Sequence, residues 1–359
     1  MKILWVFDKI GPHSSTFHYS ASYIDRLRCK GHIIDTIQTP PILECKAGYP
    51  LRILVRSFLL LIKSKKYDWV VLSAEASAYL VPFIRTESCM IVHHVIDNMS
   101  CNVRFREKID RWYLKKFICR FNAIVTASNL TSSHLKEYRY LQNFSHCLVI
   151  PNSFDLVTYE QFQLPLTQEK LFSHYQIPYS KDTRYLLYVG YEIHRKNFIT
   201  LLHLMSRVRN QNYHLIKIGG HADKNNRERH LKYIHENKLQ NITFVDRVPL
   251  KDLMSFYQIC FAFLFPSLYE GFGRPPIEAQ ASGTPVISTK AGALEEVLVD
   301  SALIINEPTN IQEWENALLK LEDKEVRSRF VRSGKKNAQR FALERNVRLW
   351  EDVFGTRKA

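Results

Sequence analysis

The feature that most constrains the fold is a stretch in which an apolar run, a glycine turn and a helix start follow one another. The run 259–265 has the length and aromatic content of a buried strand, and Pro275 and Pro276 suit the first turn of a helix. Gly283 suits the residue that ends such a helix. A buried strand that leads directly into a helix is the repeating unit of α/β folds, so the stretch predicts a domain of that class.

The turn between this strand and this helix carries groups that a phosphorylated ligand could use. Gly271 and Gly273 let the backbone approach a ligand, and the amides at a helix start can bind an anion. Glu270 on the loop and Glu278 one turn into the helix could accept hydrogen bonds from hydroxyls on either side of a phosphate. The alternative is that Glu278 complements the helix dipole and Glu270 is a solvated loop residue.

Alternating strands and helices run along the whole chain and start afresh in its second half. At 359 residues the chain is long enough for two domains, each with its own core. Both halves predict parallel, doubly wound sheets. The predicted divisions are an N-terminal domain over 1–160 joined by a last helix at about 342–359, a C-terminal domain over 180–341, and a connection over 155–182.

The charge, the cysteines and the apolar runs limit the class of protein. A net charge of +15 indicates a polyanionic partner, which could be nucleic acid, an anionic membrane or a phosphorylated substrate. The turn 8–15 after the first strand has one glycine instead of G-x-G-x-x-G, so no nicotinamide cofactor is expected. Seven scattered cysteines without CxxC pairs indicate reduced thiols. The apolar runs are too short for a signal peptide or a membrane span, which predicts a cytoplasmic protein.

The segment 51–66 combines apolar residues with cations and holds no acidic residue. This pattern is typical of a helix that lies on an anionic membrane surface. It is also typical of a core helix that packs on a sheet with its basic tip in water. A basic helix predicted over 104–120 would add to an anion-binding surface. The cations of the first segment are Arg52, Arg56, Lys63, Lys65 and Lys66.

Two adjacent histidines, His93 and His94, follow the predicted strand 88–92. Sheets of α/β proteins bind ligands at the carboxyl ends of their strands, where these histidines would lie. Because side chains alternate along a strand, only one of the two would face a ligand if the strand persists. The sequence leaves open which one.

Several segments resemble the retaining glycosyltransferases of family 4, which have the GT-B fold of two facing Rossmann-like domains. The resemblance is strongest over 188–298, where Glu270 and Glu278 match the E-x7-E motif of that family. The strand 122–128 looks like the "ad-I-ivaS" strand of the family, and 282–287 matches its "s-G-t-P-V-I". The segment 150–155 looks like its "I-P-N-G-v-D", with Ser153 in place of the glycine.

The resemblance implies a role for each residue of the glycine turn. Glu278 would accept hydrogen bonds from the ribose hydroxyls of a nucleotide sugar. Glu270 and the amides near Phe272 and Gly273 would hold the donor sugar and its diphosphate. The nucleotide sugar would therefore bind mainly to the C-terminal domain.

The resemblance also implies a basic clamp for the diphosphate. Lys196 matches the lysine of the family, whereas Tyr191 stands where a companion arginine is usual. Arg195 is the neighbouring cation that would compensate. His93 or His94 would contact the donor sugar from across the cleft.

These observations predict a retaining transferase that moves a hexose, such as mannose, glucose or GlcNAc, from a nucleotide diphosphate sugar to a glycan or lipid-linked glycan in cell-surface polysaccharide synthesis. The chain has no D-x-D pair to hold a metal ion against the diphosphate, so neither a metal nor a cofactor is expected. An anionic membrane surface is a further expected partner, at the inner face of the membrane, and nucleic acid is not. The alternative is a non-catalytic basic module that keeps the fold and binds anionic lipid or nucleic acid.

Overall fold

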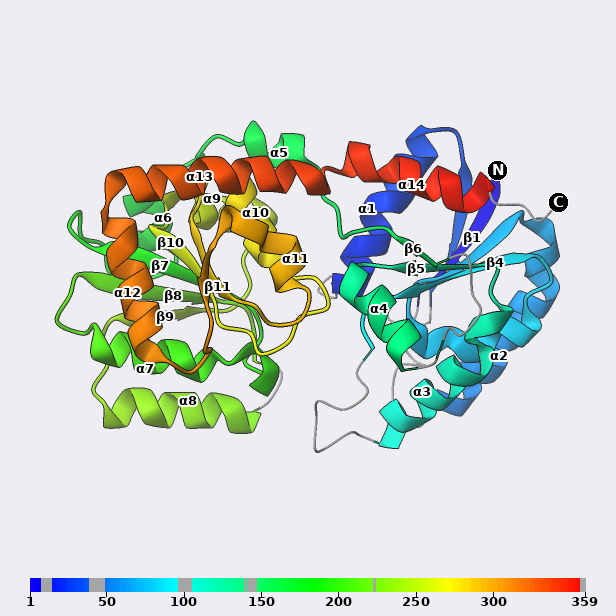
Figure 1. Ribbon diagram of the computed structural model, residues 1–359, viewed down its shortest axis with the longest axis horizontal. Coiled ribbons are helices and arrows are strands. Elements are labelled where there is room, and N and C mark those ends of the chain that lie inside the picture. Colours follow the sequence, from blue (N-terminus) through cyan, green and yellow to red (C-terminus); the bar gives the residue numbers. More distant parts are fainter. Residues whose placement is uncertain are drawn as a thin grey trace. The chain divides into compact units, whose positions relative to one another are not determined.

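The computed structural model describes residues 1–7, 15–38, 49–95, 105–138, 140, 147–221 and 224–355. The chain forms two compact units (Figure 1). Unit 1 comprises Met1–Asp155 and Phe341–Ala359, and unit 2 comprises Leu156–Arg340. The turn 8–14 and Arg104, which both carried predictions, lie outside the described residues.

Unit 1 is built on a parallel sheet of short apolar strands. In spatial order the strands are β2 (Ile33–Ile37), β1 (Lys2–Val6), β3 (Trp69–Leu72), β4 (Glu87–Val92), β5 (Ala123–Thr126) and β6 (Cys147–Val149). The α-helices and 3-10 helices of this unit are α1 (Ser15–Cys29), α2 (Tyr49–Lys63), η3 (Ser64–Lys66), η4 (Glu75–Phe83), α3 (Phe105–Phe117), η5 (Ile118–Arg120), α4 (Asn129–Glu137) and α14 (Leu343–Gly355).

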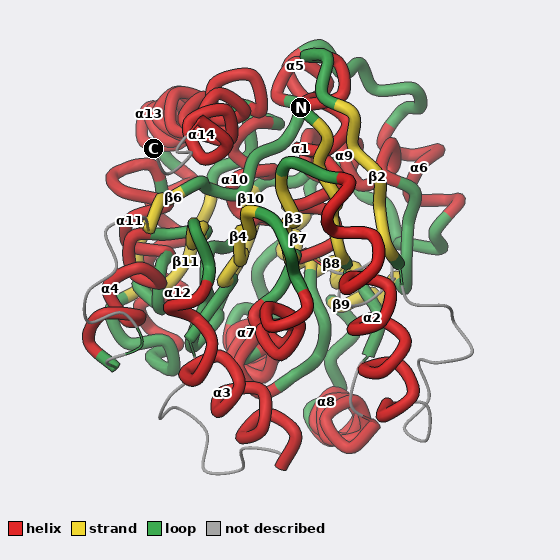
Figure 2. The backbone as a smooth tube through the Cα atoms, turned by 90° about the vertical axis from the view of Figure 1, so that its right-hand side faces the viewer, coloured by secondary structure: helices red, strands yellow, loops and turns green. Residues whose placement is uncertain are grey.

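Helices cover both faces of the unit 1 sheet, with α1 and α14 on one face and α2, α3 and α4 on the other (Figures 1 and 2). On the second face, Leu60 of α2, Leu114 of α3 and Leu135 of α4 share a buried cluster with Val6 and Met90 of the sheet. Side chains alternate along a strand, so a strand with both faces covered must be apolar throughout. This explains why inner strands such as β3 are continuous apolar runs.

The last helix of the chain, α14, packs on the first face of this sheet. Trp350 lies with its ring centroid 4.9 Å from that of Trp5 on β1. Ser153, which stands where the resembling family has glycine, accepts hydrogen bonds from Tyr23 of α1 at 2.8 Å and from Asn346 of α14 at 2.9 Å. The serine therefore links the end of β6 to both helices.

Unit 2 repeats this architecture with a second parallel sheet. In spatial order its strands are β12 (Leu303–Ile305), β11 (Val286–Thr289), β10 (Ala262–Phe265), β7 (Arg184–Val189), β8 (Tyr213–Ile218) and β9 (Ile242–Val245). Its α-helices and 3-10 helices are α5 (Leu156–Glu160), α6 (Gln168–His174), η6 (His194–Lys196), α7 (Phe198–Arg207), α8 (Lys224–Glu236), α9 (Leu250–Ile259), α10 (Arg274–Ala281), α11 (Leu294–Leu298), η7 (Val299–Ser301), α12 (Ile311–Glu322) and α13 (Lys324–Ala338), with η8 (Gln339–Phe341) at the unit boundary.

The order of the strands in unit 2 reverses between β7 and β10. The chain runs outward from β7 through β8 to β9, and β10 then pairs with the other side of β7. Turns that follow two such strands diverge and leave room for a ligand at the carboxyl edge of the sheet. The two turns in question are 190–197 after β7 and 266–273 after β10.

The segment 155–182, predicted to connect the two domains, is instead part of unit 2 from residue 156 onward. It forms α5 and α6, and Leu171 and Phe172 of α6 are buried in the core. The ring of Phe172 lies 4.5 Å from that of Tyr185 on β7. Pro165 and Pro178 lie on either side of α6 and obscure its short apolar pattern in the sequence, whereas its packing on β7 holds it in place.

Candidate functional site

The turns after β7 and β10 bring a lysine, an arginine and a glutamate together at the reversal point of the unit 2 sheet. Nζ of Lys196 lies 2.5 Å from Oε1 of Glu270, and Nη1 of Arg195 lies 3.2 Å from its Oε2. The hydroxyl of Ser267 donates to Oε1 of the same carboxylate at 2.7 Å. The structure thus places Glu270 beside both cations that the sequence had assigned to a diphosphate.

Burial and charge act in opposite directions on this carboxylate. Burial raises the pKa of Glu270, but the charges of Lys196 and Arg195 and the hydrogen bonds from Lys196 and Ser267 outweigh it, and the net pKa is lowered. Burial also lowers the pKa of Lys196, and the nearby Glu270 charge counteracts this in part. The group therefore consists of a carboxylate held ionised between two cations, only one of which, Arg195, is substantially exposed.

A glycine from a third turn supports the backbone of Glu270. The carbonyl of Glu270 accepts a hydrogen bond from the amide of Ala293 at 2.9 Å. Gly292 has a φ of +63°, and a Cβ there would overlap the Glu270 carbonyl and lie 2.9 Å from its nitrogen. Sequence reasoning missed Gly292, for which the only local signal is a glycine soon after an apolar strand. Gly271 and Phe272, which follow Glu270, are half-buried and buried.

The start of α10 has fewer free amides than the sequence analysis assumed. Gly273 is the N-cap, with a φ of +96°, and the helix begins at Arg274. Pro275 and Pro276 occupy the first turn and have no N–H to donate. Any anion bound here would therefore depend on the amides at Gly273 and Arg274 and on the two nearby cations, more than on the helix terminus alone.

Glu278 lies on α10 with an internal set of partners. Its Oε1 accepts from Nε of Arg274 at 2.6 Å, and its Oε2 accepts from the hydroxyl of Tyr257 at 3.2 Å. The residue is 7% exposed. A carboxylate offers about four acceptor positions, so these partners leave capacity for ribose hydroxyls. The sequence did not reveal the pair with Arg274.

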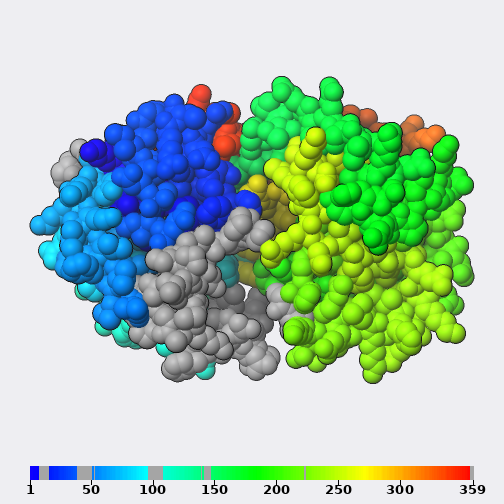
Figure 3. Space-filling view, turned by 180° about the vertical axis from the view of Figure 1, so that it is seen from behind, coloured from blue at the N-terminus to red at the C-terminus, as the bar shows by residue number. Residues whose placement is uncertain are grey.

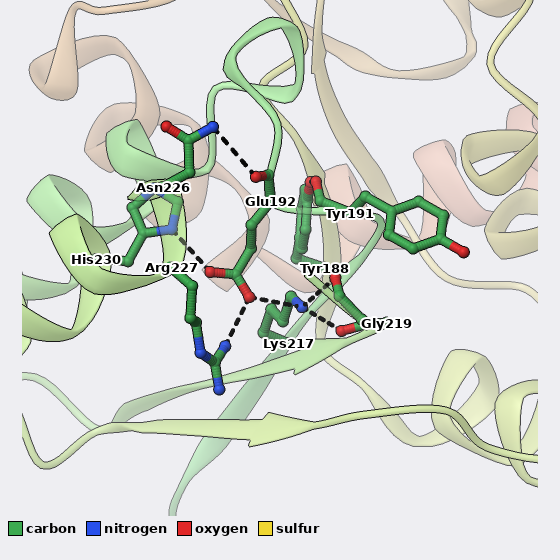
Figure 4. Close-up of polar contacts among 9 residues, drawn as sticks. Tyr188, Tyr191, Glu192, Lys217, Gly219, Asn226, Arg227 and His230 are labelled. Carbon is green, nitrogen blue, oxygen red and sulfur yellow. Dashed lines mark hydrogen bonds and ion pairs between the residues drawn. The ribbon is translucent and has the colours of Figure 1, made fainter. Parts of the chain in front are cut away.

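A second cluster of charged side chains is centred on Glu192, in the turn after β7, and includes Lys217 of β8 (Figure 4). Glu192 is fully buried, and its Oε1 accepts from Nζ of Lys217 at 2.9 Å and from Nη1 of Arg227 at 2.6 Å. Nδ1 of His230 lies 2.8 Å from Oε2. The carbonyl of Glu192 accepts from the side-chain amide of Asn226 at 3.3 Å.

This cluster connects the turn that carries Lys196 to the next strand and to α8. Lys217 also donates to the carbonyls of Gly219 and Gly220, which follow β8. Burial raises the pKa of Glu192, but hydrogen bonds from His230 and Lys217 and the nearby cationic charges lower it to about 2. Sequence reasoning missed the cluster. Its one signal was a lysine inside the apolar strand β8.

Tyr191 stands where the resembling family has an arginine. Figure 4 shows its ring directed away from the Glu192 cluster. Its carbonyl accepts a hydrogen bond from Tyr188 at 3.2 Å. Arg195 supplies the second cation next to Glu270 and also donates to the carbonyl of Tyr269 at 3.2 Å.

His93 and His94 follow β4, as predicted, and have different surroundings. His93 is buried, its Nε2 lies 3.0 Å from the carbonyl of Ser73, and burial lowers the pKa of His93. The side chain of His94 is 41% exposed, and its Nδ1 lies 3.5 Å from Oε1 of Glu75. Of the two histidines, His94 is therefore the one that a ligand can reach.

Neither a metal site nor a membrane span is found in the described ranges. The His, Cys, Asp and Glu side chains of those ranges form no group of three or more that could hold a metal ion. The helices in the same ranges lack the length and apolarity to cross a bilayer.

Comparison with known proteins connects unit 2 to one enzyme family. Residues 170–337 match the family model described as glycosyl transferases group 1. The O-antigen chain mannosyltransferase RfbU of Salmonella typhimurium is 34% identical over 138 residues, which is 38% of this chain and 38% of that protein. The MMP alpha-(1->4)-mannosyltransferase of Mycolicibacterium hassiacum is 40% identical over 91 residues, or 24% of this chain and 21% of that protein. The matches thus span well under half of these relatives.

Solved structures match over nearly the whole chain. Sucrose-phosphate synthase from Thermosynechococcus elongatus has a TM-score of 0.79 at 18% identity and covers 99% of this chain and 100% of its own. Anabaena Alr3699/HepE in complex with UDP and glucose has a TM-score of 0.80 at 14% identity, with the same coverage. At these identities the likeness concerns the fold alone, and it confirms the predicted α/β class with GT-B architecture. Residues 170–337, which contain Lys196, Glu270 and Glu278, thus belong to the group 1 glycosyltransferase family.

Proposed function

We propose that the protein is a retaining hexosyltransferase that uses a nucleotide diphosphate sugar. The observation that carries the proposal is the meeting of Lys196 and Arg195 with Glu270 at the reversal point of the unit 2 sheet. Such a reversal point is where open α/β sheets bind nucleotides. Two cations and a carboxylate at this place suit a diphosphate and the hydroxyls of a sugar.

In the proposed reaction, the chain stabilises the charge that develops on the leaving diphosphate. Lys196 and Arg195 supply positive charge, and the amides at Gly273 and Arg274 supply hydrogen-bond donors. Groups fixed before the reaction stabilise a developing charge without reorganising, which is often the largest contribution to catalysis. Glu270 would accept from the donor sugar, and Glu278 from the ribose.

His94 is the proposed ligand contact of unit 1. Its side chain is exposed, whereas the ring of His93 is buried against the Ser73 carbonyl and serves to hold the end of β4. In this proposal, unit 2 binds the donor and unit 1 binds the acceptor. The pairing of His94 with Glu75 would orient its ring.

The proposed acceptor is a glycan or a lipid-linked glycan used in cell-surface polysaccharide synthesis, at the cytoplasmic face of the membrane. Both relatives named above are mannosyltransferases, and one is named for the O-antigen chain. Their names favour mannose among the hexoses. The matched stretches are short parts of those proteins, so the donor has to be established directly.

The test is a screen of nucleoside diphosphates for binding and of nucleotide sugars for slow hydrolysis or transfer. Lys196→Ala and Glu278→Ala should each weaken binding of the preferred nucleoside diphosphate by at least about tenfold, since each removes one charged contact. Unchanged affinity in both variants, with thermal unfolding like that of the parent, would sink the donor-site assignment. Salt-dependent binding to any nucleic acid, without nucleotide selectivity, would favour the basic binding module instead.

A further inference from the structure

An exposed apolar stripe runs along α2, the helix that the sequence left between a core role and a membrane role. Its members recur at the three- and four-residue spacing that places side chains on one face of a helix. Between 36% and 66% of each residue is exposed. The stripe consists of Leu51, Leu54, Phe58, Leu61 and Ile62.

The opposite face of α2 packs on the core of unit 1. The exposure of the stripe therefore belongs to a helix that is firmly packed on its other face. Leu60 is fully buried in the core cluster of the sheet. Arg56, which the sequence counted among the surface cations, is buried, and its guanidinium donates to the carbonyl of Phe7 at the end of β1. The helix therefore has a core face and, unlike an ordinary core helix, a second apolar face at the surface.

Cations without acidic neighbours in sequence follow the stripe. Lys63 ends α2, and Lys65 and Lys66 of η3 come next, all three exposed. The sequence from residue 49 to residue 67 holds no aspartate or glutamate. In the space-filling view of Figure 3, the part of the chain coloured as residues 50–70 forms part of the surface of unit 1.

A second helix on the same face of the unit 1 sheet repeats this combination. Trp112 of α3 is 55% exposed, and Nζ of Lys116 lies 4.6 Å from the centre of its ring. A hollow of about 380 Å³ beside it is lined by Lys108, Ile109, Trp112 and Tyr113. Tryptophan and lysine together are typical of surfaces that meet the headgroup region of a bilayer.

We infer that α2 and η3 dock unit 1 on an anionic lipid bilayer, with the stripe in the headgroup boundary and the lysines on the lipid phosphates. A contiguous apolar patch exposed on a soluble protein marks an interaction surface. The lysines that follow the stripe favour an anionic membrane over an uncharged one. Their attraction to anionic headgroups adds to the binding of the apolar stripe. The inference rests on the proposed function in one respect, which is that the proposed acceptor is carried by a membrane.

The experiment is sedimentation of the purified full chain with vesicles of phosphatidylcholine alone and of phosphatidylcholine with phosphatidylglycerol. The parent should bind the anionic vesicles at low salt and dissociate at high salt. Two double variants divide the surface, Leu54→Gln with Phe58→Gln and Lys65→Gln with Lys66→Gln. Each should reduce partitioning onto anionic vesicles by at least about tenfold.

The matched control is Leu231→Gln with Leu250→Gln in unit 2, where the two leucines are 46% and 56% exposed. The partitioning of this variant onto anionic vesicles should lie within about twofold of that of the parent. The loss of two exposed leucines weakens vesicle binding only if those leucines lie on the docking surface. Nucleoside diphosphate binding, measured in parallel, should be the same in all these variants. Vesicle binding without nucleotide binding would overturn the proposed function and leave the inference in place.

Three results would overturn the inference. The first is a parent that does not bind anionic vesicles at low salt. The second is a stripe variant that binds them as well as the parent. The third is a parent that is a dimer in solution and a stripe variant that is a monomer, because the stripe would then be covered by a second copy of the chain.

Discussion

Replacing Glu270 with glutamine should make the protein bind a diphosphate more tightly, although Glu270 is proposed to take part in the reaction. The carboxylate of Glu270 engages both Lys196 and Arg195. A diphosphate that uses the same cations has to share them with a buried negative charge. Glutamine keeps the shape of the side chain and an acceptor oxygen for Ser267, but it removes that charge.

The distances in the site give the size of the effect. A phosphate oxygen that accepts from the same ammonium as Glu270 would lie about 4.5 Å from the carboxylate, since each hydrogen bond spans roughly 2.8 Å. At an effective dielectric constant of about 20, two unit charges at that distance repel by about 4 kcal/mol. The two cations and nearby water reduce this net cost, so we expect a gain of at least about 1.4 kcal/mol, or about tenfold in the dissociation constant.

The assay is isothermal titration calorimetry with inorganic pyrophosphate and with the preferred nucleoside diphosphate. Glu278→Gln is the matched control, because the same change there affects a carboxylate whose partners are Arg274 and Tyr257. The control should bind pyrophosphate like the parent and the nucleoside diphosphate more weakly. Pyrophosphate binding that is unchanged or weaker in Glu270→Gln, with thermal unfolding like that of the parent, would show that the carboxylate does not compete for the lysine.

Three further variants test the support of the site. Gly292→Ala places a Cβ against the Glu270 carbonyl at a φ of +63°, so it should lower both the melting temperature and pyrophosphate affinity by calorimetry, and an unchanged affinity would contradict the role of this glycine. Glu192→Gln should destabilise the protein at pH 7. The pKa of Glu192 is about 2 in the folded protein and about 4.3 in the unfolded chain. The difference in melting temperature between the variant and the parent should therefore shrink as the pH falls towards 2. Arg274→Leu removes a partner of Glu278 and should change nucleoside diphosphate affinity while leaving pyrophosphate affinity within about twofold.

The sequence was sufficient for the parts of the fold that depend on local patterns. The strand predicted at 88–92 is β4, at Glu87–Val92, and Gly283 follows α10 with a φ of +85°. Apolar runs, and the glycines and prolines that bound them, are local signals. The strands and helix ends that they indicate can therefore be predicted without knowledge of the rest of the chain. The helix α6 was missed because its apolar pattern is too short to be recognised in the sequence alone. The helix is held by its packing on core residues such as Tyr185, which lie elsewhere in the chain.

For α2 the sequence was ambiguous for a physical reason. Apolar residues lie on both sides of the helix, so periodicity could not say which side meets the core. The burial of Arg56 and Leu60 and the exposure of Leu54 and Phe58 settle the orientation. Arg56, one of the cations that the sequence assigned to this segment, is instead bound to the carbonyl of Phe7 at the end of β1.

The difference between the predicted and the missed parts of the site follows from the topology. Lys196 and Glu270 are 74 residues apart, yet their meeting could be anticipated, because both follow strands that flank the reversal point of one sheet. The pairing of Glu192 with Lys217 could not, since a lysine inside a buried strand has no partner that a strand pattern specifies. That pair involves the same turn as Lys196. The turn after β7 is thus joined by ion pairs both to Glu270 at the candidate diphosphate site and to Lys217 on β8, and the second of these contacts lies outside the site itself.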